Sequence, residues 1–211
     1  MPVGVAVMAR APVPGEAKTR LIPALGAEGA ARLQAWMLAR AVETACAAGV
    51  GPVELWHAGD ATHPAFSAYR ASGVPALRAQ PEADLGTRML AALRGSVTSA
   101  GALVIGTDCP ALTPQGLRDA AAALRGHDAV VVPAEDGGYV LIGMREPRAE
   151  AFAGIAWGGE QVMAATRARL RALDWRWAEL PPLWDVDRAA DLQRLWALYP
   201  EARAAAGARS A

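Results

Sequence analysis

The sequence predicts a single α/β domain with a central, mostly parallel mixed sheet flanked by helices. Three observations indicate this fold class. Short apolar runs rich in β-branched residues alternate along the chain with segments of helical periodicity. Several apolar runs lead directly into loops that carry charge, glycine or proline. With 211 residues, of which 53% are hydrophobic, the chain has enough apolar material for one core.

The first predicted strand covers residues 3–8, where Val3, Val5 and Val7 lie in an apolar run. Such a run has no polar side and is typical of a strand buried on both faces of a sheet. Similar runs predict strands at 53–57, 77–80, 102–106, 128–133, 139–143 and 175–180.

Helices are expected between these strands. Residues 26–48 place Leu33, Met37 and Ala45 at helical spacing, and Thr113 followed by Pro114 is typical of a helix start. Further helices are expected at 62–71, which Gly73 would close, from residue 85 onward, from 113 to about 125, and at 159–173.

The last predicted helix begins with Asp187 as its N-cap and ends at Pro200. Its buried stripe is expected to consist of Leu192, Leu195 and Leu198. Residues 201–211 are predicted to be a flexible tail, so the folded domain is expected to span residues 1–200. The tryptophans near this end of the chain are expected to pack in the core.

Composition restricts the partners. The formal net charge is +0, which gives no support for binding nucleic acid or an anionic membrane and favours a small-molecule partner. Cys46 and Cys109 are too few for a disulfide framework or a four-cysteine zinc site, so we expect a cytoplasmic protein. No signal-peptide pattern and no apolar run of membrane-spanning length is visible. The sequence does not indicate an oligomeric state.

The loop after the first strand concentrates positive charge. Two prolines stiffen it, and we expect Arg10, Gly15, Lys18 and Arg20 to contact substrate. Ligands of open α/β sheets bind at the carboxyl ends of the strands, and lysine and arginine suit phosphate oxygens. The alternative is a solvated basic turn without a ligand.

Asp108 follows the buried strand 102–106 and precedes Pro110. A carboxylate at this point could hold a hard cation between the protein and a diphosphate, although an aspartate that caps the next turn is the alternative. Asp136 precedes Gly137 and Gly138, which would let a ligand approach the backbone. Asp136 could bind sugar hydroxyls or take a proton from an acceptor, or the segment could be a plain hairpin turn.

Two further pairs have functional and structural interpretations. Asp185 and Asp187 alternate in an extended segment, so both could reach one cation, and we expect Asp187 to be a metal ligand beside Asp108. A helix cap plus a solvated acid is the alternative. Asp84 and Arg88, four residues apart, could contact the substrate or form a surface ion pair.

Several of these motifs together carry a resemblance to a known family. The strings are MARAPVPGEAKTRL, QPEADLGTRM, GTDCPAL, DGGYVLIG and DVDRAADL, and they span nearly the whole chain. The chain resembles the small bacterial nucleotide-diphospho-sugar transferases known as arsenosugar-biosynthesis glycosyltransferases. Where such proteins commonly have Trp, a small residue and Thr, this chain has Trp157, Gly158 and Gly159.

The resemblance implies a GT-A-like fold that binds a nucleotide-linked donor over its central sheet together with Mg²⁺ or Mn²⁺. It places Asp108 at the metal, Lys18 and Arg20 at the phosphate loop, and Asp136 with its glycines at the junction of donor and acceptor.

Three functions remain open at this stage. The first is a glycosyltransferase that moves a sugar from a nucleotide sugar to a small-molecule acceptor. The alternative is a guanylyltransferase-like nucleotidyltransferase that joins a nucleoside triphosphate to a phosphorylated acceptor and releases pyrophosphate. A nucleotide-binding domain without catalysis is the third. Walker-type, dinucleotide-binding and serine-hydrolase motifs do not follow any predicted strand.

Overall fold

The computed structural model describes residues 1–71 and 76–208 and contains a seven-stranded mixed sheet. The strand order is β3-β2-β1-β4-β6-β5-β7. The first four of these strands are mutually parallel, β6 runs antiparallel to β4 and β5, and β7 is parallel to β5. This arrangement confirms the predicted fold class. The strands are β1 (Gly4–Arg10), β2 (Val53–Ala58), β3 (Ala76–Ala79), β4 (Ala102–Ile105), β5 (Ala129–Pro133), β6 (Tyr139–Met144) and β7 (Trp177–Glu179).

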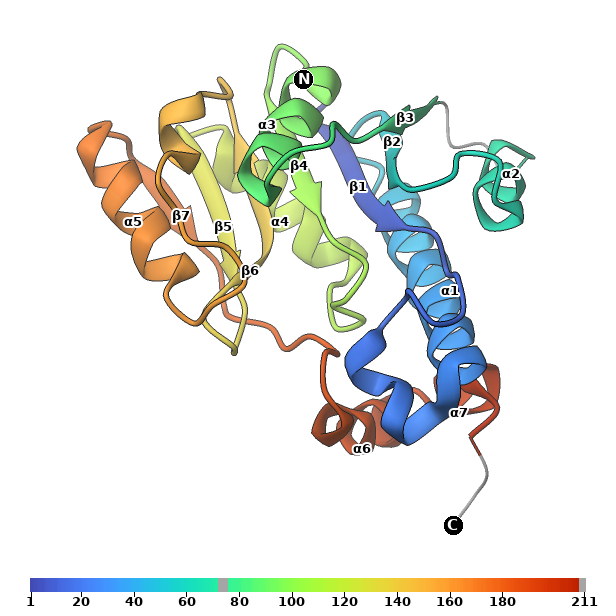
Figure 1. Ribbon diagram of the computed structural model, residues 1–211. Coiled ribbons are helices and arrows are strands. Elements are labelled where there is room, and N and C mark those ends of the chain that lie inside the picture. The colour runs from blue at the N-terminus through green and yellow to red at the C-terminus, as the bar shows by residue number, and fades with distance from the viewer. Residues whose placement is uncertain (72–75, 209–211) are drawn as a thin grey trace.

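Helices cover both faces of the sheet (Figure 1). One face packs against α1 (Ile22–Ala48), α2 (Pro64–Ala71) and α4 (Pro114–Leu124). The other face packs against α3 (Leu85–Ser96), the 3₁₀ helix η2 (Ala149–Phe152) and α5 (Val162–Ala172). The predicted closing residue of α2, Gly73, lies outside the described residues. Among the described residues, no helix has the length and apolar character needed to cross a membrane.

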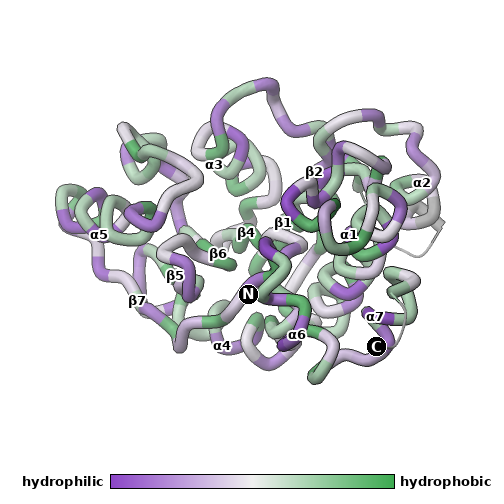
Figure 2. The backbone as a smooth tube through the Cα atoms, turned by 60° about the horizontal axis from the view of Figure 1, so that its bottom comes forward, coloured by the Kyte–Doolittle hydropathy of each residue, from purple (hydrophilic) through white to green (hydrophobic). Residues whose placement is uncertain are grey.

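The alternation of side chains along β1 separates two core layers. Val5 and Val7 pack with Leu38 of α1, whereas Ala6 packs on the opposite side with Leu93 of α3. Both faces of this strand are therefore buried, as the apolar run predicted. The covering helices are amphipathic: hydrophobic and hydrophilic residues intermix along α5 in Figure 2 because only one side of that helix meets the core.

The start of α4 follows its predicted chemistry. The Thr113 side chain accepts a hydrogen bond from the Gly116 N–H at 3.0 Å, and Pro114 occupies the first turn. α1 begins earlier than predicted, immediately after the 3₁₀ helix η1 (Thr19–Leu21). Gly26 lies in this extension with φ 69°, so the helix is kinked there.

The C-terminal region differs from the prediction in two ways. In α6 (Ala189–Leu198), Arg188 and not Asp187 occupies the N-cap position. The backbone N–H groups of Asp187 and Arg188 both donate to the Asp191 carboxylate, which does the capping from inside the helix. Leu198 is 56% exposed and does not belong to the buried stripe.

The predicted flexible tail is wrong for residues 201–206, because α7 (Pro200–Ala206) forms there. Pro200 occupies its first turn, where a proline favours a new helix as much as it ends the preceding one. Ala202 and Ala206 are 0% and 2% exposed and pack with α1, and Arg32 Nη2 donates to the Ala206 carbonyl at 2.9 Å. α6 and α7 lie together beside the first turns of α1 (Figure 1).

We predict that truncation after Tyr199 lowers the free energy of unfolding by about 2 kcal/mol or more, because the apolar surface of α1 beneath α7 becomes exposed. Urea denaturation measures this change. Truncation after Ala208 is the matched control and should leave the stability unchanged. Equal stability of both truncated chains and the full chain would show that α7 contributes nothing to the fold.

Candidate active site

A cavity of about 560 Å³ opens at the carboxyl ends of the strands. β1 and β4 are parallel neighbours, so the loops that follow them leave the same edge of the sheet. The charged and polar residues that line the cavity come from segments far apart in the sequence, and they include Arg10, Lys18, Arg20, Gln80, Arg88, Asp108, Asp136, Asp185 and Asp187. The structure therefore brings together most of the residues that the sequence singled out.

Lys18 carries a buried charged group at this site. Its side chain is 6% exposed, and its Nζ lies 3.0 Å from Asp108 Oδ1 and donates to the Val186 carbonyl at 2.6 Å. The backbone of Lys18 has φ 48° and ψ 46°, a left-handed conformation that is uncommon outside glycine. Strained residues of this kind cluster at functional sites. The ammonium is thus held in place at the floor of the cavity.

Arg20 of the same loop forms a second ion pair, with Asp187 in the segment before α6. The sequence pattern assigned the basic loop to phosphate and the acidic residues to a metal. In this structure each cation is instead neutralised by one of the acids. Opposite charges attract strongly at short range in a partly buried site, so the two sets compensate each other.

Asp108 is oriented by a buried chain of hydrogen bonds. Gln34 Nε2 of α1 donates to Thr107 Oγ1 at 3.0 Å, and Thr107 Oγ1 donates to Asp108 Oδ1 at 3.1 Å. Gln34 and Thr107 are buried, whereas the Asp108 side chain is 49% exposed to the cavity. The contacts of Thr107 and Lys18 both use Oδ1, so the carboxylate is fixed with one oxygen toward the protein. The sequence did not indicate Gln34, because a helical pattern does not show that this side chain reaches the loop after β4.

Asp185 faces two other carboxylates. Its partial burial, together with the nearby charges of Asp136 and Asp108, raises its pKa to about 6. The sequence pattern made Asp185 one of an alternating pair, of which Asp187 was the predicted metal ligand. The geometry gives the two residues different surroundings: Asp187 pairs with Arg20, whereas Asp185 shares the acidic part of the cavity with Asp108 and Asp136.

Asp136 lies in the turn between β5 and β6. Its Oδ1 accepts a hydrogen bond from the Gly138 N–H at 2.9 Å, and both residues line the cavity. Gly137 does not line it. A Cβ at Gly137 would lie 2.2 Å from the Glu160 carbonyl oxygen, and its φ is 93°, so this glycine is needed for close packing against the segment before α5.

Two other predicted contact residues do not line the cavity. Gly15 has φ 85° and shapes the loop after β1. Asp84 is the N-cap of α3, where its carboxylate accepts from the Thr87 N–H at 2.9 Å. These hydrogen bonds lower the pKa of Asp84, and the charge of Arg88 adds to them. Asp84 therefore caps α3, and its contact with substrate stays a prediction.

Cys109 also lines the cavity, but its chemistry is limited. Burial raises the pKa of its thiol to about 12. A thiol with such a pKa stays protonated at neutral pH and is a poor nucleophile. Cys109 is therefore a poorer candidate for reactive chemistry than the carboxylates and basic groups of the cavity.

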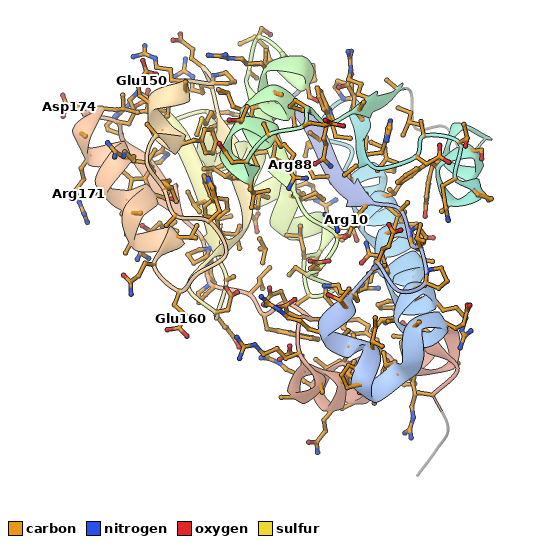
Figure 3. All side chains as sticks on the ribbon, in the orientation of Figure 1. Arg10, Arg88, Glu150, Glu160, Arg171 and Asp174 are labelled. Atoms are coloured by element: carbon orange, nitrogen blue, oxygen red, sulfur yellow. The ribbon has the colours of Figure 1, made fainter. Side chains whose placement is uncertain are left out.

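A second cavity of about 470 Å³ adjoins the first, and both are lined by Arg20, Asp136, Gly158, Gly159, Asp185 and Asp187. Its other charged residues are Glu135, Glu160, Arg188, Asp191 and Arg194. Arg194 pairs with Glu135 at 2.8 Å and lies 4.7 Å from the centre of the Trp184 ring. Figure 3 labels Glu160 at the outer edge of this region. The second cavity thus has six carboxylates against three arginines.

The Trp157 ring packs against the start of α3. It lies so close to Gly86 that a Cβ there would be 2.5 Å from Trp157 Cζ2. The side chain lines the first cavity together with Gly158 and Gly159. The other C-terminal tryptophans, at 175, 177, 184 and 196, pack against the cores, as predicted.

The donor set fits a hard divalent cation that also binds substrate oxygens. Within residues 1–71 and 76–208, no three His, Cys, Asp or Glu side chains come close enough to enclose a metal on their own. Asp108 and Asp136 nevertheless share one region with Asp185, and their charges contribute to its raised pKa. Mg²⁺ in particular is commonly bound by one or two carboxylates, waters and substrate phosphates. The residues present are compatible with that arrangement.

The fold is shared with solved transferases. A candidate nucleotide-diphospho-sugar transferase from Desulfovibrio desulfuricans G20 is 26% identical, with 96% of each chain covered and a TM-score of 0.79. Rv0371c from Mycobacterium tuberculosis H37Rv in complex with manganese is 19% identical, with 92% of this chain and 98% of that chain covered and a TM-score of 0.53. CMP:2-keto-3-deoxy-manno-octonic acid synthetase complexed with CTP is 13% identical, with 95% and 99% covered and a TM-score of 0.60.

These similarities confirm the resemblance to small bacterial nucleotide-diphospho-sugar transferases, and the fold is that of nucleotide-dependent transferases. Among curated proteins, none matches the sequence significantly. The sequence pattern of one bacterial family matches residues 41–159, which is more than half of the chain. The chain therefore belongs to this family, which is described as an uncharacterized protein conserved in bacteria (DUF2064).

Proposed function

We propose that the protein is a metal-dependent glycosyltransferase that moves a sugar from a nucleotide-diphospho-sugar to a small-molecule acceptor. One observation carries the proposal: Lys18 and Asp108 meet at the floor of a cavity that also contains Arg20 and Asp185. A diphosphate bound with a divalent cation needs protein groups of both signs within a few ångströms. The cavity offers both.

In this proposal the donor diphosphate takes the place of carboxylates as partner of the basic groups. Lys18 and Arg20 donate to phosphate oxygens, and Asp108 and Asp187 are released from their ion pairs. The Lys18 ammonium and the Arg20 guanidinium then stabilise the negative charge that grows on the diphosphate as it leaves the sugar. The buried Gln34–Thr107 hydrogen bonds keep Asp108 oriented through this exchange.

Asp108 and Asp185 would hold the cation, Mg²⁺ or Mn²⁺. Asp187 is the ligand predicted from the sequence, but Asp185 shares the acidic part of the cavity with Asp108 and has no arginine or lysine at ion-pair distance among the described residues, so we propose Asp185 as the second ligand. The bound cation supplies positive charge to the departing diphosphate. Manganese binding by Rv0371c, which has the same fold at 19% identity, is consistent with this assignment.

The second cavity supports a neutral, hydroxyl-bearing acceptor. Asp136 lines both cavities and is placed to accept a hydrogen bond or a proton from an acceptor hydroxyl. The excess of carboxylates there disfavours a phosphorylated acceptor, and two of the three arginines are already paired with acids. This charge distribution favours glycosyl transfer.

Nucleotidyl transfer to a phosphorylated acceptor is the second candidate. It is favoured by the acids at Asp108 and Asp185, which could hold two cations for an in-line displacement at phosphorus. The CTP-bound synthetase shows that the same fold accommodates a nucleoside triphosphate in that protein.

We expect a metal-dependent increase in thermal stability that is larger with a nucleotide sugar than with the corresponding triphosphate, because ligand binding to the folded state stabilises it. The measurement is a melting curve against nucleotide sugars and nucleoside di- and triphosphates, each with Mn²⁺, Mg²⁺ or EDTA. In Asp108→Asn the metal-dependent part should disappear while circular dichroism shows a folded protein. A preference for triphosphates would support nucleotidyl transfer, and no shift with any nucleotide would refute both candidates.

We further predict opposite effects of Asp185→Asn on stability and on binding. Removing one of three facing carboxylates should raise the melting temperature of the metal-free protein by about 2–4 °C, which corresponds to about 1 kcal/mol for a chain of this size once solvent screening is allowed for. The same variant should lose most of the metal-dependent shift.

Differential scanning calorimetry in EDTA and in Mn²⁺ measures both effects of Asp185→Asn. Glu28→Gln, an equivalent change at an exposed acid outside both cavities, should produce neither. A lower melting temperature in EDTA would contradict the carboxylate crowding described above.

A further inference from the structure

Arg88 carries a donor that has no partner within the described residues. Its guanidinium donates through Nη1 to Gln80 Oε1 at 3.4 Å, and its Nε is buried without a hydrogen bond. A buried unsatisfied donor is costly, and beside a cavity such a donor is suited to bind a ligand. Arg88 lines the first cavity, and Figure 3 labels it beside β1 near Arg10.

The neighbouring Gln80 fixes which edge of Arg88 remains available. Gln80 Nε2 donates to the carbonyls of Trp56 and Ala9 at 2.7 and 3.4 Å, so its Oε1 is the atom turned toward Arg88. Asp84 contributes only a charge attraction, because its carboxylate caps α3. Nη1 is therefore engaged, while the edge formed by Nε and Nη2 has no recorded partner among the described residues.

On the basis of the proposed function, the place of the Arg88 Nε–Nη2 edge along the sheet relates it to the nucleoside end of the donor. Gln80 and Arg88 follow β3, Asp108 follows β4, and Asp136 follows β5 on the opposite side. The Gln80 amide nevertheless reaches back to carbonyls of β1 and β2, and Arg88 lies in the first turn of α3 beside β1 (Figure 3), on the side of β4 that faces away from β6 and Asp136. In a nucleotide sugar the diphosphate lies between the sugar and the nucleoside. With the diphosphate at Asp108 and the sugar toward Asp136, the nucleobase extends toward Arg88.

We propose that Arg88 reads the nucleobase through its Nε–Nη2 edge and that the donor therefore carries guanine or cytosine. This edge consists of two parallel donors, which match two adjacent acceptors. Guanine presents O6 and N7, the pairing most often made by arginine, and cytosine presents O2 and N3. On the corresponding edges of adenine and uracil, each acceptor has a donor beside it, so these bases do not offer two adjacent acceptors to the two donors of Arg88. On binding, the buried Nε gains a partner while Nη1 keeps its hydrogen bond to Gln80.

The test is calorimetric titration of the full chain with GDP, CDP, ADP and UDP in the presence of Mn²⁺. GDP or CDP should bind about tenfold more tightly than both ADP and UDP, as expected for one bidentate base contact. Arg88→Lys keeps the charge but loses the fork, so it should weaken the preferred nucleotide by about the same factor and leave ADP and UDP unchanged. Arg94→Gln, on the exposed side of the same helix, is the control and should match the wild type.

The outcomes separate this inference from the proposed function. Equal affinity of the wild type for all four nucleotides, or a uniform loss in Arg88→Lys, would overturn base reading while nucleotide binding stands. Tighter binding of ADP or UDP than of GDP and CDP would overturn base reading as well. If none of the four binds in Mn²⁺, the proposed function and this inference fail together.

Discussion

The ion pair between Lys18 and Asp108 is the interaction on which the geometry of the site depends. An ammonium that is 6% exposed has lost most of its hydration and requires a charged or polar partner. Asp108 and the Val186 carbonyl supply it, and the Val186 N–H donates in turn to the Asp108 carbonyl at 2.8 Å. The basic loop, the end of β4 and the segment before α6 are thereby joined at one point. None of the three has regular secondary structure there to hold it otherwise.

The same pairing explains why a site made of so many charges is stable without a ligand. Lys18 with Asp108 and Arg20 with Asp187 are each close to neutral, whereas Asp136 and Asp185 are aspartates of the cavity without an arginine or lysine at ion-pair distance in the described chain. The raised pKa of Asp185 reflects its partial burial together with the charges of Asp136 and Asp108. Active sites commonly retain such unfavourable charges, because the groups that bind substrate are rarely those that stabilise the empty protein best.

Much of the fold was predictable from the sequence, whereas much of the ion pairing within the site was not. The strands that run into Arg10 and Asp108 could be recognised because short apolar runs rich in β-branched residues are typical of buried strands. Asp108 and Lys18 could be expected to share an edge, since parallel strands end there. The choice between Asp185 and Asp187 could not be made, because both alternate on an extended segment and only the position of Arg20 distinguishes them. The sites themselves remain predictions.

Failures at the chain's C-terminal end have a different physical origin. Alanine-rich residues after Pro200 look like a tail, because alanine gives little hydrophobic signal. Small side chains, however, allow α7 to approach α1 closely, and Arg32 completes its last turn. Asp84 shows a different limit: its position before an amphipathic segment is typical of a helix cap as well as of a ligand contact. The hydrogen bond from the Thr87 N–H shows the cap, whereas the substrate contact stays a prediction. The unpartnered Arg88 Nε one turn later is the feature that spacing could not reveal, since it depends on where Gln80 points. For Arg88, the proposed ligand contact is indicated by a hydrogen bond that the protein leaves unmade, and this feature becomes visible only once the segments after β3, β4 and β5 have been brought to one edge of the sheet.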